Sequence, residues 1–255
     1  MIDIALMYIY PLDARQEFLA NCKRWTESYL RIDPGERHRV IIVLPNGTPT
    51  DDDKALFKGI ECEFTEYQEP GWDIGAYQHV AQSFDADLLI CTNSRVRFWK
   101  GGWMTRFRQA YEMFGPKGLY GASASYEAGA YEAACPYPNP HIRTACFATN
   151  PKILRRFPYK VDSRAKGFMF ESGQWNFMHW YRDHGWPVKL VTWDGFYDAK
   201  DWRKPQNVFR SGNQSNCLVK DRHHDLYDNA DPKTKLHLEK MAGPVMRLAK
   251  DRVMA

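Results

Sequence analysis

The stretch Leu88-Leu89-Ile90-Cys91-Thr92-Asn93-Ser94 decides the fold class, because four apolar residues are followed directly by three polar ones. A short apolar run closed by a polar turn is typical of a strand buried on both faces of a sheet. Two similar runs precede it, Ile4 to Tyr10 and Val40 to Leu44, and an alternating strand is predicted from Glu61 to Tyr67. The first half of the chain therefore contains four predicted strands.

Helical patterns separate these strands. Apolar residues recur every three or four positions in three segments, which predicts helices with one buried face. Alternation of strands and helices in turn predicts an α/β fold with a mainly parallel, Rossmann-like sheet flanked by helices. The three apolar stripes are Phe18, Cys22, Trp25 and Tyr29; Ile74, Tyr77, Ala81 and Phe84; and Trp103, Phe107, Tyr111 and Phe114.

The second half of the chain is less regular. Strands are expected at residues 118–125, 141–148 and 188–193, a long loop at 127–140, and helices at 152–157 and 171–184. Residues 198–231 are polar and irregular, and the end of the chain is expected to form an amphipathic, basic tail helix. With no internal repeat and no low-complexity linker, residues 1–255 are expected to form a single domain.

Composition narrows the class of protein. Of the 255 residues 44% are hydrophobic, with 9 Trp, 14 Tyr and 14 Phe, which is ample for a sizeable core. No apolar run is long enough to span a membrane, and the first residues lack the basic flank of a signal peptide. The six cysteines form no CxxC pair, which favours reduced thiols in a cytoplasmic protein. The net charge of +4 suits an anionic ligand such as a nucleotide, and nothing indicates an obligate protein partner.

Ligands of open α/β sheets bind beyond the carboxyl ends of the strands. Free N–H groups at a helix start favour an anion there, small residues let a ligand approach closely, and an arginine can neutralise a diphosphate. The alternatives are that Asp73 only caps its helix and that the turn after Cys91 is an ordinary solvated one. The residues at these places are Tyr10; Asp73, Gly75 and Ala76; and Thr92, Asn93, Ser94 and Arg95.

Taken in order, four segments resemble GT-A-fold glycosyltransferases of the glycosyltransferase 2-like kind: Asp73-Ile74-Gly75-Ala76, Leu88 to Ser94, Trp103, and His141 to Phe147. The resemblance covers roughly residues 1–195. It implies a hexosyltransferase-type enzyme (EC 2.4) that moves a sugar from a nucleoside-diphosphate donor, with a UDP-sugar as first choice. Residues 1–115 would bind the donor and residues 116–197 the acceptor, while residues 198–255 would form C-terminal loops and the tail helix.

Most GT-A enzymes hold Mn²⁺ or Mg²⁺ with an Asp-x-Asp motif, where this chain has Thr92-Asn93-Ser94. Asp85-Ala86-Asp87 matches the motif by letters but precedes its strand, at the wrong end of the sheet. We therefore expect weaker metal dependence than in a typical GT-A enzyme. Similar enzymes use a late histidine on the metal or diphosphate, which makes His223 and His224 the candidates; solvent-exposed, inert histidines are the alternative.

Inverting members of the family use a carboxylate as base. Glu171 is the first choice here, because it follows an apolar stretch and opens a predicted helix, with Asp162 and Asp194 in reserve. The alternative is a structural glutamate in a first helical turn. A retaining route would need no such base. For the acceptor, the candidates are Trp103, His141, Arg143 and Thr144, although His141 would equally suit a buried, hydrogen-bonded position.

The acceptor itself is open between a glycan and a modified, hydroxymethylated DNA base. The second is kept because late loops are rich in Arg and Lys, which bind phosphates without sequence preference. The other functions considered are a nucleotidyltransferase and a catalytically inactive protein that binds a nucleotide or glycan. The basic residues in question are Arg203, Lys204, Arg210, Lys220 and Arg222.

Overall fold

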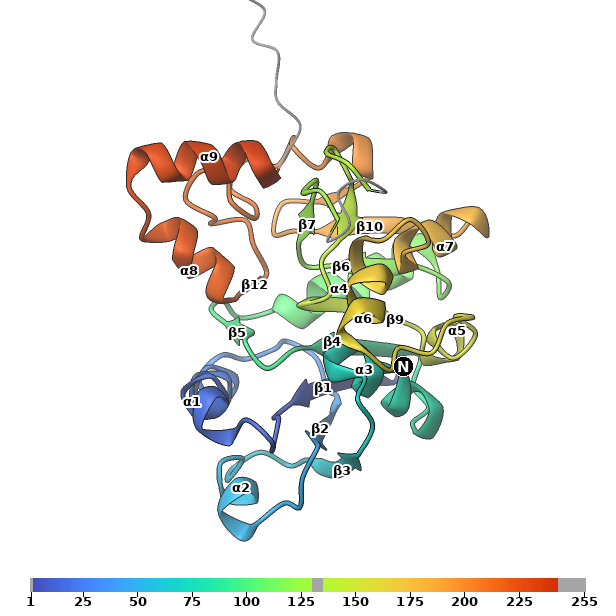
Figure 1. The fold of residues 1–255 in the computed structure, drawn as a ribbon, viewed down its shortest axis with the longest axis vertical. Helices are drawn as coiled ribbons and strands as arrows, with labels where there is room; N and C mark the ends of the chain where they lie inside the picture. Colours follow the sequence, from blue (N-terminus) through green and yellow to red (C-terminus); the bar gives the residue numbers. More distant parts are fainter. Residues whose placement is uncertain (1, 130–134, 243–255) are drawn as a thin grey trace, which may run out of the picture.

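Within residues 2–129 and 135–242, which the computed structural model describes, a mixed eight-stranded sheet forms the centre of the fold (Figure 1). β9 and β11 run antiparallel to their neighbours and the other strands run parallel to one another, which confirms the predicted α/β fold with a mainly parallel sheet. In spatial order the strands are β11 (Phe196–Tyr197), β10 (Val188–Val191), β6 (Leu119–Gly121), β9 (Cys146–Thr149), β4 (Leu88–Thr92), β1 (Ile4–Ile9), β2 (Arg39–Pro45) and β3 (Glu63–Tyr67).

Helices cover both faces of this sheet. α1 (Arg15–Arg31) and α4 (Trp103–Phe114) pack on one face, with the short α2 (Asp51–Ala55) following β2. The other face is covered by α3 (Trp72–Ser83), α5 (Pro151–Leu154), α6 (Arg164–Ser172) and α7 (Phe177–Asp183). Since successive side chains of a strand point to opposite faces, β1 places Met7 in the α3 layer and Tyr8 in the α1 layer.

Two small sheets attach the second half of the chain to this core. β5 (Arg97–Phe98), just after β4, pairs with β12 (Val219–Lys220), and β7 (Ala124–Ser125) pairs with β8 (His141–Ile142). After β12 come α8 (Arg222–Asp228) and α9 (Pro232–Ala242), and a 3-10 turn at Ala199–Asp201 follows β11. β12 and the start of α8 therefore lie near the carboxyl end of β4.

The structure differs from the expected element boundaries in the second half. The helix predicted over residues 171–184 is two helices, because Asn176 caps α7 by accepting from the His179 N–H at 2.9 Å. Glu171 consequently lies in the last turn of α6 and does not open a helix. The strand predicted at 118–125 divides between β6 and β7, which belong to different sheets. The long loop and the tail helix fall partly on residues 130–134 and 243–255, outside the described residues.

The connections of β1 set the place for a ligand. β1 lies between β2 and β4, and the helices that follow β1 and precede β4, α1 and α3, lie on opposite faces of the sheet. Ligands of open α/β sheets bind at such a reversal of strand order, outside the carboxyl ends. In the described ranges, no helix is both long and apolar enough to cross a membrane.

Candidate functional site

Asp73, Asn93 and Arg95 come together beyond the carboxyl ends of β1 and β4. The Asn93 side chain lies close enough to the Asp73 carboxylate to lower its pKa, and its Oδ1 accepts the Arg95 backbone N–H at 3.0 Å. The positive charge of Arg95 also acts on Asp73. The start of α3 and the turn after β4 are thus joined by polar side chains at the point where the strand order reverses.

The first turn of α3 is not capped by any side chain. Gly71 occupies the N-cap position, and Asp73 is the second residue of the helix. The alternative that Asp73 serves only as the N-cap is therefore wrong. An uncapped N-terminus leaves backbone N–H groups and the positive end of the helix dipole available to an anion.

Asp73 has a raised pKa, at about 6. Desolvation is the main cause, and the negative charge of Glu171 adds to it, while Arg95 and the Asn93 side chain act in the opposite direction. The residue as a whole is nevertheless only partly buried. Glu171 is therefore close enough to influence the ionisation of Asp73, although the two residues come from different helices.

Glu171 is held in place through the backbone of Thr144. Its Oε1 accepts the Thr144 N–H at 2.9 Å, while the Tyr77 hydroxyl donates to the Thr144 carbonyl at 3.0 Å. The Glu171 side chain remains half-buried. One oxygen of the carboxylate is thus fixed by the protein, and sequence reasoning missed Tyr77 as a partner because it reads as one residue of an apolar helical stripe.

His141 and Arg143 are buried close to this site. His141 Nδ1 lies 2.8 Å from the carbonyl of Asn139, and burial lowers its pKa, although Glu171 opposes the shift. Arg143 donates to Asp221 at 3.0 Å, and its guanidinium stacks on Phe209 at 4.1 Å. The charge of Arg143 is therefore already neutralised inside the protein.

Several predicted donor residues are occupied by packing. The Thr92 hydroxyl is fully buried and donates to the Met7 carbonyl at 2.6 Å, so it cannot contact a ligand. Ala76 is also fully buried. A Cβ on Gly75 would collide with the Tyr67 hydroxyl, so that glycine serves helix packing and not ligand approach. The expectations for Thr92, Gly75 and Ala76 are thus corrected.

Tyr10 and Ser94 are almost fully buried as well. The Tyr10 ring packs against Phe57 with ring centres 6.3 Å apart. The Ser94 hydroxyl has no hydrogen-bond partner within the part of the chain that the structure describes. A donor contact by either residue stays a prediction.

Trp103 does not face a cleft. Its indole is fully buried and stacks on Phe98 with ring centres 4.2 Å apart, in the layer that α1 and α4 form on the sheet. A residue without accessible surface cannot bind an acceptor, so the expectation for Trp103 is wrong.

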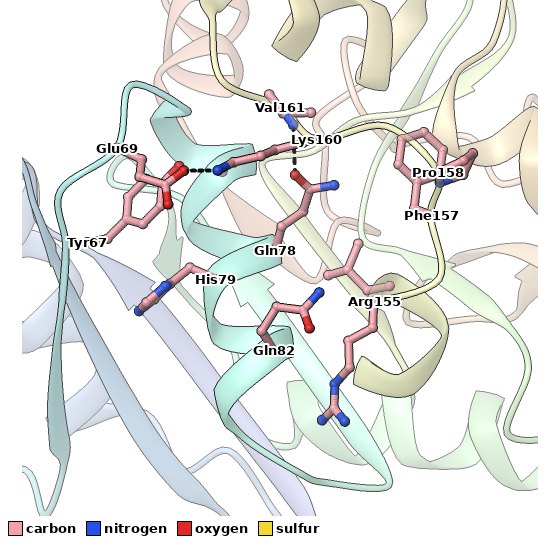
Figure 2. Close-up of a pocket in the computed structure, with 12 residues that line it drawn as sticks. Tyr67, Glu69, Gln78, His79, Gln82, Arg155, Phe157, Pro158, Lys160 and Val161 are labelled. Atoms are coloured by element: carbon pink, nitrogen blue, oxygen red, sulfur yellow. Dashed lines mark hydrogen bonds and ion pairs between the residues drawn. The ribbon is translucent and has the colours of Figure 1, made fainter.

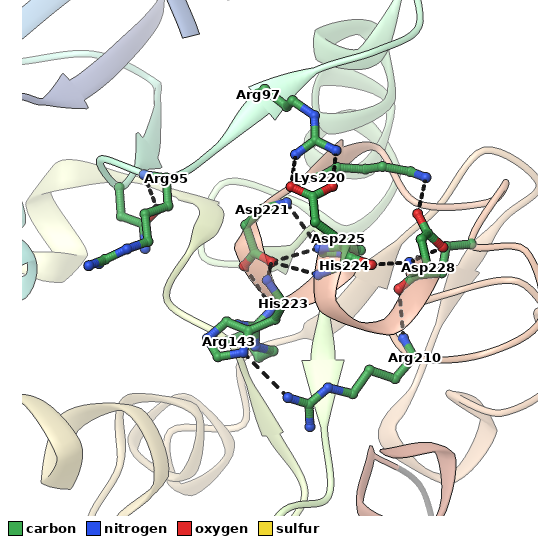
Figure 3. Close-up of polar contacts among 12 residues, drawn as sticks. Arg95, Arg97, Arg143, Arg210, Lys220, Asp221, His223, His224, Asp225 and Asp228 are labelled. Atoms are coloured by element: carbon green, nitrogen blue, oxygen red, sulfur yellow. Dashed lines mark hydrogen bonds and ion pairs between the residues drawn. The ribbon is translucent and has the colours of Figure 1, made fainter. Parts of the chain in front are cut away.

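The C-terminal histidines belong to a buried polar cluster around Asp221 (Figure 3). Asp221 caps α8 by accepting from the N–H groups of His223 and His224, and its Oδ1 lies 2.8 Å from His224 Nδ1. His223 Nδ1 lies 3.3 Å from an Arg210 guanidinium nitrogen. Both histidines start a helix, and the cap preference of aspartate is the sequence signal that would have revealed Asp221.

The residues present do not form a metal site of the kind the family resemblance implies. No group of three or more His, Cys, Asp or Glu side chains within 2–129 and 135–242 is arranged to hold an ion. The metal role expected of His223 and His224 finds no set of ligands around them. Arg97 is not free to bind an anionic ligand, because it is ion-paired with Asp225. Arg95 stands apart from this cluster in Figure 3.

A cavity of about 370 Å³ lies elsewhere, on the outer side of α3 (Figure 2). Gln78 spans part of it, donating to the Tyr159 carbonyl at 2.8 Å and accepting the Val161 N–H at 2.9 Å. Lys160 pairs with Glu69 at its rim. These polar groups mainly hold residues 159–161 against α3, so the cavity carries little chemistry of its own.

No family model matches the chain, and no curated protein matches its sequence. Among solved structures, mouse xyloside xylosyltransferase 1 in its apo form is 11% identical over 74% of this chain and 85% of that chain, with a TM-score of 0.49. HddC from Yersinia pseudotuberculosis is 14% identical over 64% of this chain and 83% of that chain, with a TM-score of 0.42. HddC in complex with GMP-PN is 13% identical over 64% of this chain and 83% of that chain, with a TM-score of 0.41. Likeness at this level decides nothing about activity.

Proposed function

We propose that this chain is a glycosyltransferase that moves a sugar from a nucleoside-diphosphate donor to a hydroxyl acceptor with inversion. One observation carries the proposal: Asp73, Asn93, Arg95 and Glu171 converge at the reversal of strand order. This is where α/β sheets bind nucleotides. The site combines an uncapped helix start, a cation and two carboxylates, which suits a substrate with hydroxyls and a diphosphate.

The donor would lie across the carboxyl ends of β1 and β4. Asp73 and Asn93 would bond its hydroxyl groups, and Arg95 with the first turn of α3 would face the diphosphate. Arg95 is currently ion-paired with Glu17 at 3.1 Å, and that glutamate is 65% exposed. Exposed pairs contribute only about 0–1 kcal/mol, so a phosphate can readily replace Glu17.

Glu171 would act as the general base. Its Thr144-bound oxygen fixes the orientation of the carboxylate, and the other oxygen would accept the acceptor hydroxyl proton. The acceptor oxygen then bonds to the anomeric carbon while the bond from that carbon to the diphosphate oxygen breaks. The diphosphate leaves with the electron pair, and Arg95 and the α3 start stabilise its charge.

A glycan is the acceptor that we favour over a modified DNA base. Three of the five basic residues in the late loops are already paired with carboxylates, so they offer little free charge to a DNA backbone. Arg203 lies beside the Glu239 carbonyl, and Arg222 is exposed. The three pairs are Lys204–Asp201, Arg210–Glu127 and Lys220–Asp228.

The test is a thermal-shift panel of UDP-, GDP-, CMP- and dTDP-sugars, followed by a transfer assay with each donor that binds. A ligand that binds only the folded state raises the unfolding midpoint, and we expect this for at least one nucleoside-diphosphate sugar. Asn93→Ala should reduce the shift. Binding without donor turnover would indicate a nucleotide-binding protein, transfer of the nucleotidyl group a nucleotidyltransferase, and no binding at all would contradict the proposal.

A further inference from the structure

Trp72 holds an unusual position at the start of α3. It directly precedes Asp73, its backbone has φ +51°, and its indole is 62% exposed. A bulky residue in the left-handed region is strained by roughly 1–2 kcal/mol. Such strain usually marks a functional position. An exposed indole gains little from the fold in return, which points to contact with a ligand as its role.

Two residues of α6 lie beside this indole. The Arg164 guanidinium is 6.0 Å from the centre of the Trp72 ring and 5.5 Å from the centre of the Phe168 ring. Phe168 is 38% exposed. A cation therefore lies within 6.0 Å of the centres of two aromatic rings whose residues both remain open to solvent.

The charge of Arg164 is not paired with a carboxylate in the described part of the chain. The neighbouring lysines on this side are paired, Lys166 with Asp162 and Lys160 with Glu69. Arg164, by contrast, has no carboxylate within 4.0 Å among residues 2–129 and 135–242. Its positive charge is available to an anionic ligand.

These three residues adjoin the proposed reaction site. Residues three or four apart share a helix face, so Phe168 lies on the same face of α6 as Arg164 and Glu171. Trp72 is next to Asp73, and α3 packs against α6 (Figure 1). The exposed aromatic rings thus continue the surface that begins at the two carboxylates.

We propose that Trp72, Arg164 and Phe168 form an acceptor platform that binds a negatively charged sugar. The rings would stack on the apolar face of the sugar, and Arg164 would bind its carboxylate or phosphate. The role of the platform as an acceptor site rests on the proposed transfer reaction. Binding of a sugar to the platform can, however, be measured without any transfer. It adds the substrate class: an acidic glycan in place of a neutral one.

The test is a ligand-observed NMR titration of the full chain with three sugars in low-salt buffer. The probes are methyl glucuronide for a carboxylate, glucose-6-phosphate for a phosphate, and neutral methyl glucoside. We expect at least one charged probe to bind roughly fivefold more tightly than the neutral one, the worth of one partly exposed ion pair. Whichever charged probe binds better identifies the anionic group.

Variants assign the binding to the platform. Arg164→Gln should remove the preference for charge, and Trp72→Gly and Phe168→Leu should each weaken binding by roughly two- to tenfold. Trp72→Gly also removes the backbone strain, so the protein should remain folded. Matched controls are Arg156→Gln, which removes another exposed arginine, and Phe64→Leu, since Phe64 is also 38% exposed but lies on β3.

Three outcomes would contradict the proposed platform. They are equal affinity for all three sugars, no binding of either charged probe, and unchanged affinity in the platform variants. Nucleotide binding is measured separately and distinguishes the two proposals. A platform that fails while UDP-sugar still binds leaves the transferase proposal standing. Binding of charged sugars with no nucleotide binding would leave the platform as a glycan-binding surface and remove the transfer reaction.

Discussion

Burial raises the pKa of Asp73, and the carboxylate of Glu171 adds to that rise, although the two residues come from the first turn of α3 and the last turn of α6. Like charges in a partly desolvated site oppose each other's ionisation. Two carboxylates brought together in this way cost stability at neutral pH. Such a cost is typical of a site kept for binding or catalysis.

The first prediction concerns the pH dependence of stability. The pKa of folded Asp73 is about 6, above its ordinary value of 3.8, so the folded state holds a proton that the unfolded state has lost. Stability therefore falls as pH rises from 3.8 to about 6. Asp73→Asn removes this effect and should stabilise the protein by about 1–2 kcal/mol at pH 8. Urea unfolding measures this difference in stability, which should vanish near pH 4. An Asp73→Asn variant that is less stable than the unmodified protein at pH 8 would show that the carboxylate is structurally required.

The second prediction concerns the base. Glu171→Gln keeps a carbonyl oxygen for the Thr144 N–H but cannot accept a proton, so kcat should fall by roughly 10²–10⁴ with little change in donor affinity. Asp162→Asn and Asp194→Asn are the controls, since both residues are other carboxylates of the second half. Near-normal kcat in a folded Glu171→Gln protein would remove Glu171 from the mechanism and favour one of these residues or a retaining route.

The third prediction concerns metal dependence. In the described residues, no three His, Cys, Asp or Glu side chains are grouped so that they could hold a metal ion. We therefore expect EDTA to reduce activity less than it does in an enzyme with an Asp-x-Asp motif. The measurement is the transfer rate before and after chelation, with Mn²⁺ added back. If chelation abolishes the rate and Mn²⁺ restores it, other groups hold an ion, and His223 and Asp225 would be substituted first.

The fourth prediction concerns the buried pair of Arg143 and Asp221. Burial alone would raise the pKa of Asp221, but the charges of Arg143 and His224 hold it well below its usual range. A lowered pKa in the folded state stabilises the protein above the ordinary pKa, and that contribution is lost as pH falls. Removing one partner leaves a buried charge unpaired, so Asp221→Ala should cost about 3–5 kcal/mol of unfolding free energy.

The matched control for that prediction is Asp162→Ala, since Asp162 pairs with Lys166 at the surface. We expect a much smaller cost for this variant, because exposed ion pairs contribute little to stability. Urea unfolding at pH 7 measures both variants. A cost for Asp221→Ala as small as that for Asp162→Ala would show that the cluster around α8 does not hold the C-terminal segment in place.

Strong local patterns predicted the first half of the fold well. β1, β2 and β4 follow from their apolar runs, and α1, α3 and α4 follow from stripes at helical spacing. The second half depends on contacts that no local pattern contains. β7 and β8 are two residues long each, and Arg143 meets Asp221 across 78 positions of sequence.

The candidate site likewise has parts that the sequence predicts and parts that depend on tertiary packing. The rule that ligands bind at the carboxyl ends of strands selected Asp73 and Asn93, which the structure brings close together, while their donor role stays a prediction. It could not tell that Trp103 is turned into the core or that Thr92 bonds within the sheet, because burial depends on the packing of α1 and α4. Trp72, Arg164 and Phe168 come together only when α3 packs against α6.

The most direct test of the account is a crystal structure of the chain with UDP. We expect the nucleotide beyond the carboxyl ends of β1 and β4, with Asp73 and Asn93 within hydrogen-bond distance of it and Arg95 released from Glu17 toward the phosphates. A nucleotide bound in the cavity of Figure 2, or among the residues around Asp221 in Figure 3, would contradict the assignment of the donor site.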